Sequence, residues 1–234
     1  MLGSPRGAVV AATDVAATEA WLRGLGAIVD GARGTVEVVA ADGAWDRGPL
    51  QGGTAALDFY VRDVGAREHV TVSLGPLVMK QARVVGPDGL PVVLIDANHR
   101  RPSLLDTSDL PVSVAHSLVW VVPSIDETLA FFRDAGLSVA FDLPITSDAV
   151  CELMNLPAGT TVRMAMLSDE ALTPMRFELF EAPGTTSWDG VIRAGMAWPV
   201  FDGGQDLSWE SVTEVAPGVQ RCVAPGGVLV ELRA

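Results

Sequence analysis

Residues 8–27 read AVVAATDVAATEAWLRGLGA and residues 118–137 read LVWVVPSIDETLAFFRDAGL, so the chain contains two versions of one pattern. An offset of 110 residues aligns them and places Gly26 under Gly136. In each version an apolar run precedes a segment with a capping side chain at its start and glycine at its end, which is typical of a helix. The pattern therefore predicts a duplicated strand–helix unit, and an internal repeat constrains the whole fold.

The repeat continues with different offsets. Residues 56–64 (ALDFYVRDV) match 195–203 (GMAWPVFDG) at an offset of 139, and 84–94 (VVGPDGLPVVL) match 222–232 (CVAPGGVLVEL) at 138. The offset grows by 29 residues (139 − 110) between the first and second matches, so the second copy is longer after its helix. We expect strand, helix and three strands in the second copy, followed by a shorter similar unit. The first copy is truncated after its helix.

Alternating and continuous apolar runs predict the individual elements. Residues 66–75 fit either a short helix or an irregular strand, and the polar segment 99–111 has the composition of a linker. Segment 143–160 fits either a lid over a site or a packed connection. We predict helices at 15–25, 125–135 and near 206–214, and strands at 9–11, 35–40, 55–62, 82–86, 91–96, 113–122, 137–142, 161–167, 175–181 and 195–201, followed by a final hairpin that turns at 225–227.

Composition limits the function. The formal net charge is −13, from 16 basic and 29 acidic residues, and such a surface repels phosphate backbones, so we expect no nucleic-acid partner. No apolar run approaches the roughly 20 residues needed to span a bilayer, which argues against a membrane partner. The N-terminus does not resemble a secretory signal, and the two cysteines, Cys151 and Cys222, fit a reducing compartment. We therefore expect a cytoplasmic protein, and the richness in Arg, Ala, Val and Gly is typical of a bacterial genome.

The second half resembles a known family. A strand containing His116 precedes the helix IDETLAFFRDAGL (125–137), followed by Phe177-Glu178-Leu179 and the terminal hairpin PGGVLVEL (225–232). This combination resembles the vicinal oxygen chelate superfamily, which includes glyoxalase I, bleomycin-resistance proteins and extradiol dioxygenases. The resemblance implies an α+β fold of tandem βαβββ modules that form two cup-shaped mixed β-sheets with flanking helices. On this basis we predict a degenerate glyoxalase-like module pair at 1–98, a linker at 99–111, and a module pair carrying the site at 112–234.

In metal-bearing members of the superfamily, ligands come from the first and last strands of each paired module. The resemblance places His116, Glu178 and Glu231 at such positions, whereas Gly195 falls at the fourth and cannot ligate through a side chain. One imidazole and two carboxylates suit Zn, Mn, Ni or Fe. Glu178 or Glu231 would be the catalytic base where it is not a firm ligand. Each residue also has an ordinary explanation. His116 could be a half-buried histidine, Glu178 could pair with a neighbouring arginine, and Glu231 could lie at a solvated strand end.

The first copy lacks these groups. Arg6 aligns with His116 and Val93 aligns with Glu231, while the segment that would match Glu178 is missing. Asp58 and Asp96 lie near strand positions, but neither aligns with a ligand position. We therefore expect the first half to act as scaffold or pocket wall.

The predicted pocket is apolar and aromatic, which suits a flat hydrophobic ligand. Each of its residues is also a plausible core residue. The resemblance leaves two main functions open: a metal-dependent lyase or isomerase that forms an enediolate from a small carbonyl-bearing metabolite, or a metal-free bleomycin-resistance-type protein that binds a planar hydrophobic compound. An extradiol-type dioxygenase fits less well, because its second histidine would fall at Gly195. A homodimer is the default assembly. The predicted pocket residues are Trp120, Met164, Met166, Arg176 and Trp198.

Overall fold

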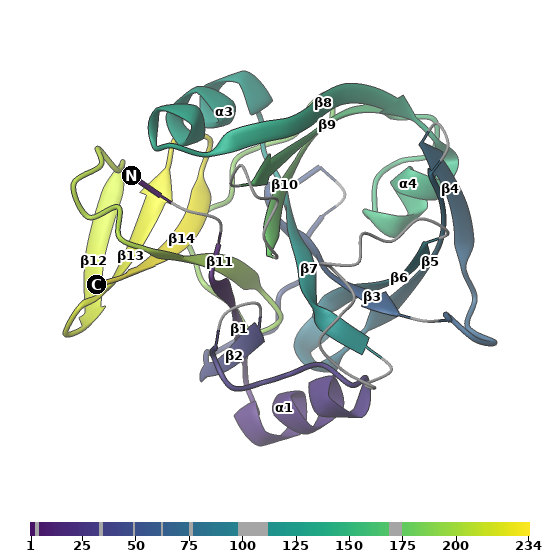
Figure 1. The fold of residues 1–234 in the computed structure, drawn as a ribbon, viewed down its shortest axis with the longest axis horizontal. Coiled ribbons are helices and arrows are strands. Elements are labelled where there is room, and N and C mark those ends of the chain that lie inside the picture. The colour runs from purple at the N-terminus through teal and green to yellow at the C-terminus, as the bar shows by residue number, and fades with distance from the viewer. Residues whose placement is uncertain are drawn as a thin grey trace.

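A computed structural model describes residues 1–2, 5–32, 35–48, 50–61, 63–74, 77–97, 112–168 and 175–234. They form four consecutive units, each dominated by β-strands (Figure 1). The first unit contains β1 (Gly7–Ala12), α1 (Val15–Gly24) and β2 (Thr35–Ala40), and the second contains β3 (Gly53–Val61), β4 (Val70–Leu74), β5 (Leu77–Val85), the 3-10 turn η1 (Pro87–Gly89) and β6 (Pro91–Ala97). The third contains β7 (Val112–Val121), α3 (Ile125–Asp134), β8 (Ser138–Thr146), α4 (Asp148–Leu153), β9 (Thr161–Ser168) and β10 (Arg176–Glu181), and the fourth contains β11 (Ala197–Asp202), β12 (Ser211–Ala216), β13 (Val219–Ala224) and β14 (Val228–Arg233).

The predicted duplication is present at the level of local structure. The Asp14 side chain accepts a hydrogen bond from the Ala17 backbone N–H at the start of α1, and Ser124 does the same for Glu127 at the start of α3. Both helices end just before a glycine with positive φ, Gly26 or Gly136. The first unit contains only one strand after its helix, whereas the third contains three, as the offsets predicted.

The strands form two mixed sheets, in agreement with the predicted α+β class. The eight-stranded sheet has the order β4-β5-β6-β3-β7-β10-β9-β8, and the six-stranded sheet has the order β12-β13-β14-β11-β1-β2. Each sheet therefore combines one unit from each half of the chain, through the antiparallel pairs β3–β7 and β1–β11. The expectation that each half builds its own cup is wrong, since the second unit pairs with the third and the first pairs with the fourth.

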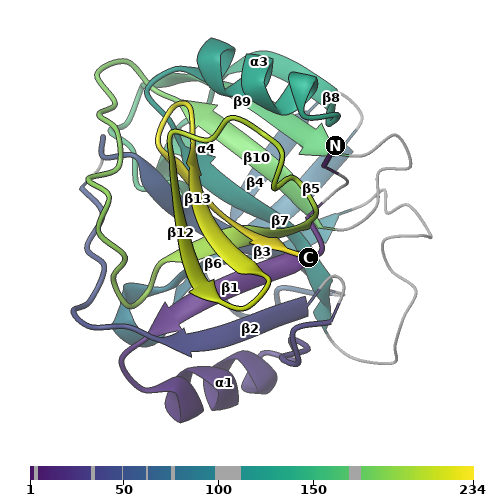
Figure 2. The same cartoon turned by 90° about the vertical axis from the view of Figure 1, so that its left-hand side faces the viewer.

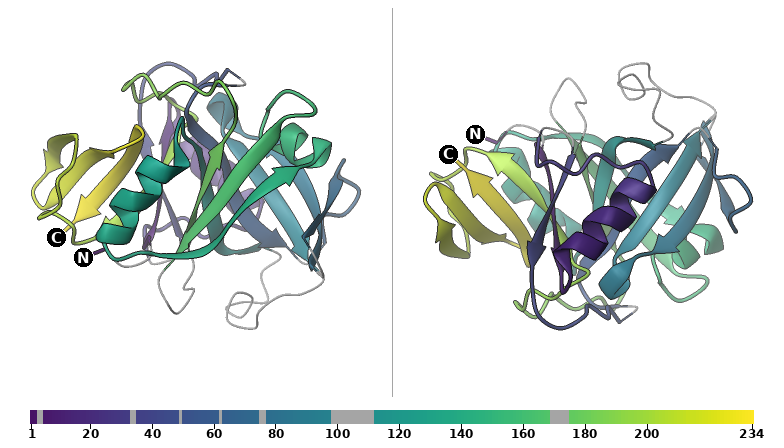
Figure 3. Two further views of the ribbon diagram at one scale, coloured as in Figure 1. Left: turned by 90° about the horizontal axis from the view of Figure 1, so that it is seen from above. Right: turned by 90° about the horizontal axis from the view of Figure 1, so that it is seen from below.

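The main core fills the space between the sheets, and the two longer helices lie at its edges (Figure 2). Leu22 of α1, Phe132 of α3, Trp120 of β7 and Trp198 of β11 all belong to this core. Figure 3 shows α3 from above and α1 from below, each lying across the junction of the two sheets. The curved face of the eight-stranded sheet has a second apolar cluster of its own, which lies around α4.

Close contacts between helices and hairpins depend on glycine in both copies. A Cβ on Gly86, beside η1, would lie 2.6 Å from the Trp21 ring of α1, and one on Gly226 would lie 2.2 Å from the Thr128 hydroxyl of α3. The sequence motif shared by 84–94 and 222–232 therefore brings each hairpin against the helix of a unit whose strands belong to the other sheet.

Several local predictions change. The expected helix near 206–214 is wrong, because Ser211–Ala216 forms the exposed edge strand β12. The ambiguous segment 66–75 contains the strand β4, and the predicted linker 99–111 lies outside the described residues. Within the described ranges, no helix is long and apolar enough to cross a membrane.

Candidate functional site

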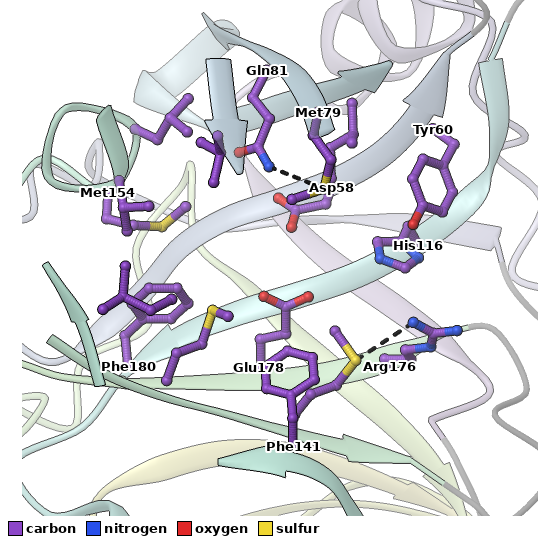
Figure 4. A pocket seen from close by; sticks show the side chains of 17 residues that line it. Asp58, Tyr60, Met79, Gln81, His116, Phe141, Met154, Arg176, Glu178 and Phe180 are labelled. Atoms are coloured by element: carbon purple, nitrogen blue, oxygen red, sulfur yellow. Dashed lines mark hydrogen bonds between the residues drawn. The ribbon is translucent and has the colours of Figure 1, made fainter. Parts of the chain in front are cut away.

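The curved face of the eight-stranded sheet encloses a pocket with a volume of about 660 Å³, counting its open mouth. Side chains from β3 and β5 form one wall, and side chains from β7, β9 and β10 form the other (Figure 4). The polar groups gather near the centre, where β3 and β7 run side by side. The lining residues are Asp58, Tyr60, Val72, Met79, Gln81, Ile95, His116, Phe141, Ile145, Val150, Leu153, Met154, Met164, Met166, Arg176, Glu178 and Phe180.

A β-bulge at His116 sets the geometry of the polar centre. Asp58 pairs with Ser117 and Phe59 pairs with Ala115, so His116 is the extra residue on β7. The bulge allows the His116 side chain to line the pocket while the adjacent Ser117 hydroxyl bonds to Asp58 on the same side. It also breaks the alternation of side chains along the strand.

Two buried carboxyl groups face one another across the pocket. Asp58 from β3 and Glu178 from β10 point toward each other in Figure 4, with exposed fractions of 4% and 8%. The Ser117 hydroxyl donates a hydrogen bond of 2.8 Å to Asp58 Oδ2, whereas Asp58 Oδ1 is buried without a hydrogen-bond partner among the described residues.

Burial and mutual repulsion change the titration of this pair. Desolvation raises the pKa of Asp58 well above its usual range, and the nearby charge of Glu178 raises it further. Desolvation also raises the pKa of Glu178, but the Ser117 hydroxyl and the charge of Arg176 oppose the rise. Asp58 is therefore the member of the pair that holds a proton more strongly.

His116 lies beside these carboxyls and is buried. Its ring centroid is 4.2 Å from that of Tyr60, and its Nδ1 has no hydrogen-bond partner within the described residues. Desolvation, together with the charge of Arg176, lowers the pKa of His116 to about 3, so the imidazole is neutral at pH 7. A neutral imidazole can accept or donate a hydrogen bond to a ligand but adds no positive charge.

The rest of the pocket is apolar and rich in sulfur. Met79, Met154, Met164 and Met166 all line it, and flexible thioethers adapt to ligands of irregular shape. Segment 143–160, for which the sequence left a lid or a packed connection open, contributes α4, which lies inside the curve of the sheet in Figure 1.

The end of α4 is attached to the loop between β2 and β3. The Arg47 guanidinium is almost fully buried and donates hydrogen bonds to the carbonyls of Gln51 and Met154. Asn155 Nδ2 donates to the Arg47 carbonyl at 3.4 Å. Because Met154 lines the pocket, these bonds hold one part of its cover in place.

The structure brings together five of the residues expected at the site: His116, Glu178, Met164, Met166 and Arg176. The sequence allowed the first half to form a pocket wall, but its individual site residues were missed, above all Asp58 and Tyr60. Asp58 was set aside because the repeat aligns it with Ala197 rather than with a ligand. An acidic residue within the apolar strand GTAALDFYV was nevertheless a usable signal, since buried carboxylates are rare without a specific role.

Trp120 and Trp198, which were expected to line the pocket, do not contact it. Both are 0% exposed and belong to the main buried cluster; Trp120 meets Trp188 edge-on at 6.2 Å, and the Arg221 guanidinium carbon lies 5.0 Å from the centroid of the Trp198 ring. The bulge at His116 explains the error for Trp120, because the residues after it point to the opposite face from the one that plain alternation from His116 predicts. Trp198 lies in β11, which belongs to the other sheet.

Glu231, expected as a metal ligand or catalytic base, is also absent from the pocket. It lies on β14 in the six-stranded sheet, where Arg233 Nη2 donates to it at 2.6 Å and Arg221 Nε at 3.4 Å. Gly195, expected at the fourth ligand position, packs against the η1 turn instead. A Cβ there would lie 2.1 Å from the Asp88 carbonyl oxygen, at a φ of +91°.

The predicted metal set is therefore not assembled. His116 and Glu178 lie in one sheet and Glu231 in the other, and the described residues contain no group of three His, Cys, Asp or Glu side chains placed to hold one ion. The ligand-type groups that do line one pocket are Asp58, His116 and Glu178, and its two carboxyls share one hydroxyl neighbour and repel each other's charge. These side chains do not fit the Zn, Mn, Ni or Fe site that the sequence predicted.

Comparisons with known proteins identify the fold. No protein-family model matches the chain, and no curated protein matches it. A glyoxalase I variant from Zea mays has a TM-score of 0.64 and 18% identity, covering 98% of this chain and 92% of that one. A Bacillus subtilis protein with a proposed dioxygenase assignment has a TM-score of 0.62 and 12% identity, covering 99% and 86%. The chain thus has the glyoxalase-like fold, and at these identities the similarity establishes the fold alone.

Proposed function

We propose that this protein binds a small, largely apolar molecule in the pocket of the eight-stranded sheet, without a metal ion. The observation that supports this most directly is the pocket itself, which combines an apolar and sulfur-rich lining with a few convergent polar groups.

The same pocket favours the metal-free alternative over a metal-dependent lyase, isomerase or dioxygenase. Those reactions were predicted from a ligand set that includes Glu231, and Arg221 and Arg233 engage that carboxylate in the other sheet. The proposed binding position lies between the β3–β6 and β7–β10 units, away from Trp120 and Trp198, which the sequence predicted as pocket residues.

A neutral fluorescent probe tests the proposal. N-phenyl-1-naphthylamine becomes bright in apolar surroundings, and we expect one molecule to bind per chain. Met164→Trp fills the pocket, so it should weaken probe binding by about tenfold or more, which corresponds to about 1.4 kcal/mol. The matched control is Val212→Trp on the exposed strand β12, which adds the same ring far from the pocket and should bind like the wild type.

The metal-free part has a separate test. Dialysis against a chelator should leave probe affinity unchanged, and metal analysis of the purified protein should give less than about a tenth of an equivalent, unchanged by His116→Ala. Probe binding that survives Met164→Trp would overturn the location of the site. Loss of binding on chelation, restored by Mn, Ni or Zn, would overturn the absence of a metal.

The homodimer remains a prediction from the sequence. Because β3–β6 and β7–β10 of one chain form the pocket, a monomer contains all its described lining residues. We therefore expect probe binding to be independent of protein concentration, whatever the oligomeric state measured by sedimentation.

A further inference from the structure

We propose that a second pocket, which contains Arg47 and Arg83, binds a phosphate group, either as free phosphate or as part of a small phosphate monoester. This arginine pocket has a volume of about 620 Å³, counting its open mouth. It lies between the β2–β3 loop, the ends of β5 and β6, and the chain that follows α4. Its polar lining residues are Trp45, Asp46, Arg47, Thr54, Arg83 and Asn155.

The arginine pocket is separate from the apolar pocket proposed above, although both lie on the same face of the eight-stranded sheet. Arg83 comes two residues after Gln81 on β5, and Gln81 lines the apolar pocket (Figure 4). At the end of α4, Met154 lines the apolar pocket and the next residue, Asn155, lines the arginine pocket. The hydrogen bond from Arg47 to the Met154 carbonyl therefore lies at the boundary between the two.

The two arginines bring like charges together in a partly buried place. Arg47 is buried, and it donates hydrogen bonds to the Gln51 and Met154 carbonyls, which carry no formal charge. Burial, followed by the charge of Arg83, lowers the pKa of Arg47 to about 10. The two guanidinium groups thus repel each other. A dianion between them would relieve this repulsion more fully than a singly charged carboxylate would.

Two hydrogen-bond donors of the arginine pocket lack acceptors within the described ranges. Arg83 is exposed and forms no hydrogen bond or ion pair with a described residue. Trp45 is 5% exposed, and its Nε1 is buried without a hydrogen-bond partner among those residues. An indole N–H can only donate, and a guanidinium donates through several N–H groups in a fixed fork. Phosphate oxygens suit both donors, since arginine binds phosphate through paired hydrogen bonds.

The Trp45 ring is held in a fixed position. A Cβ on Gly53 would lie 2.9 Å from Trp45 Cζ2, so glycine lets the ring pack directly against β3. On the ring, the Arg193 guanidinium carbon lies 5.6 Å from the centroid, and Arg193 Nη2 pairs with Asp189 at 2.7 Å. The indole N–H is therefore preorganised. Its burial without an acceptor costs free energy, and a bound oxyanion would offset that cost.

One acidic residue, Asp46, also lines the arginine pocket. Its side chain is exposed, and no ion pair among the described contacts joins it to Arg47 or Arg83. Water and salt screen an exposed carboxylate beyond ion-pair distance, so Asp46 does not take the place of a bound dianion. If the two arginines served only solubility, the pocket would show no preference for phosphate over other anions.

Calorimetric titration with inorganic phosphate at pH 8 and constant ionic strength tests this inference. Phosphate groups are mainly dianions at this pH, and Arg47 keeps its charge. We expect one site per chain with a dissociation constant below about 1 mM, and weaker binding of acetate. A second titration, with methyl phosphate, distinguishes the two sources. Tighter binding of the ester would identify a monoester as the ligand, and tighter binding of inorganic phosphate would identify the free ion.

Arg83→Gln should weaken phosphate binding by about tenfold or more without lowering the free energy of unfolding, because Arg83 has no described partner to lose. Arg83→Lys keeps the charge but not the fork, so it should bind with intermediate affinity. The matched control is Arg133→Gln, which removes an equal charge from an exposed position on α3 and should bind phosphate like the wild type. Met164→Trp fills the apolar pocket and should also leave phosphate binding unchanged, so the two sites are tested independently.

Absence of binding at about 10 mM phosphate would overturn the phosphate site. Wild-type affinity in Arg83→Gln would overturn its location. Equal losses in Arg83→Gln and Arg133→Gln would show a general effect of net charge instead of a site. Trp45→Phe keeps an aromatic ring but lacks the N–H, and in the folded protein it should weaken phosphate binding several-fold.

Discussion

The two sheets contain buried carboxylates in opposite settings. In the six-stranded sheet, Glu231 is 2% exposed and bonded to two arginines, one of which also reaches Glu37 at 2.6 Å. In the eight-stranded sheet, Asp58 and Glu178 are almost as buried, but they face each other and a pocket, with the charge of Arg176 nearby. One sheet pairs its carboxylate with two arginines of the chain, whereas the other places two carboxyls beside a pocket.

This difference separates a structural role from a functional one. Arg221 also covers the Trp198 ring, with its guanidinium carbon 5.0 Å from the ring centroid, so the six-stranded sheet fills its curved face with its own side chains. The eight-stranded sheet keeps its curved face open and covers it with α4. Among the described residues, the eight-stranded sheet has a pocket of about 660 Å³ on its curved face, whereas the pocket beside Arg6, Glu37 and Arg233 of the six-stranded sheet is about 160 Å³.

The largest expected effect on stability comes from Trp120, which lies after the His116 bulge and points into the core. Trp120→Ala should lower the free energy of unfolding by about 4 kcal/mol, because it removes a fully buried ring between the sheets. The folded fraction should still bind N-phenyl-1-naphthylamine with nearly wild-type affinity. Urea unfolding and dye titration provide the two measurements. If Trp120→Ala kept the wild-type free energy of unfolding but no longer bound the dye, Trp120 would be a pocket residue and its assignment to the core would be wrong.

Much of the fold was predictable from local patterns, because helix caps, glycine stops and turns act over a few residues. The pairing of units was not, since the same module can pair with either neighbour and the choice depends on contacts such as Gly195 against the Asp88 carbonyl. Only part of the site could be predicted, because part of it depends on the same pairing of units. His116 and Glu178 were found from their motifs, while Asp58 entered the pocket only because β3 pairs with β7.

A second prediction compares Glu231 directly with Glu178. Glu231→Gln should lower the free energy of unfolding by about 2–3 kcal/mol, because Arg221 and Arg233 lose their buried partner. Glu178→Gln has the same shape change but removes repulsion, so at pH 8 it should leave stability unchanged or increase it. Equal losses in both variants, measured by urea unfolding, would contradict the distinction between the sheets.

A third prediction follows from the raised pKa of Asp58. Between the unfolded pKa of about 4 and the higher folded value, the folded state binds more protons than the unfolded one, so stability falls as pH rises. Asp58→Asn removes this term, so the stability of the variant relative to wild type should increase with pH by up to about 1.4 kcal/mol per unit within that window. Comparing the two proteins at each pH cancels the contribution of His116. A constant difference from pH 4 to pH 9 would mean that Asp58 titrates normally.

The smallest effect compares the two copies of the helix start. Asp14→Ala should cost about 1 kcal/mol, because the Asp14 side chain accepts a 2.9 Å hydrogen bond from Ala17 N. Ser124→Ala should cost less, since its bond to Glu127 N is 3.4 Å and Glu181 also accepts from Ile125 N at 2.6 Å in the same turn. Urea unfolding of both variants, with the exposed Ser211→Ala as control, measures the difference. Because the second helix has a carboxylate from β10 as an additional cap, its start is fixed to the strand that also carries Glu178. A larger loss for Ser124→Ala than for Asp14→Ala would show that Glu181 does not share this role.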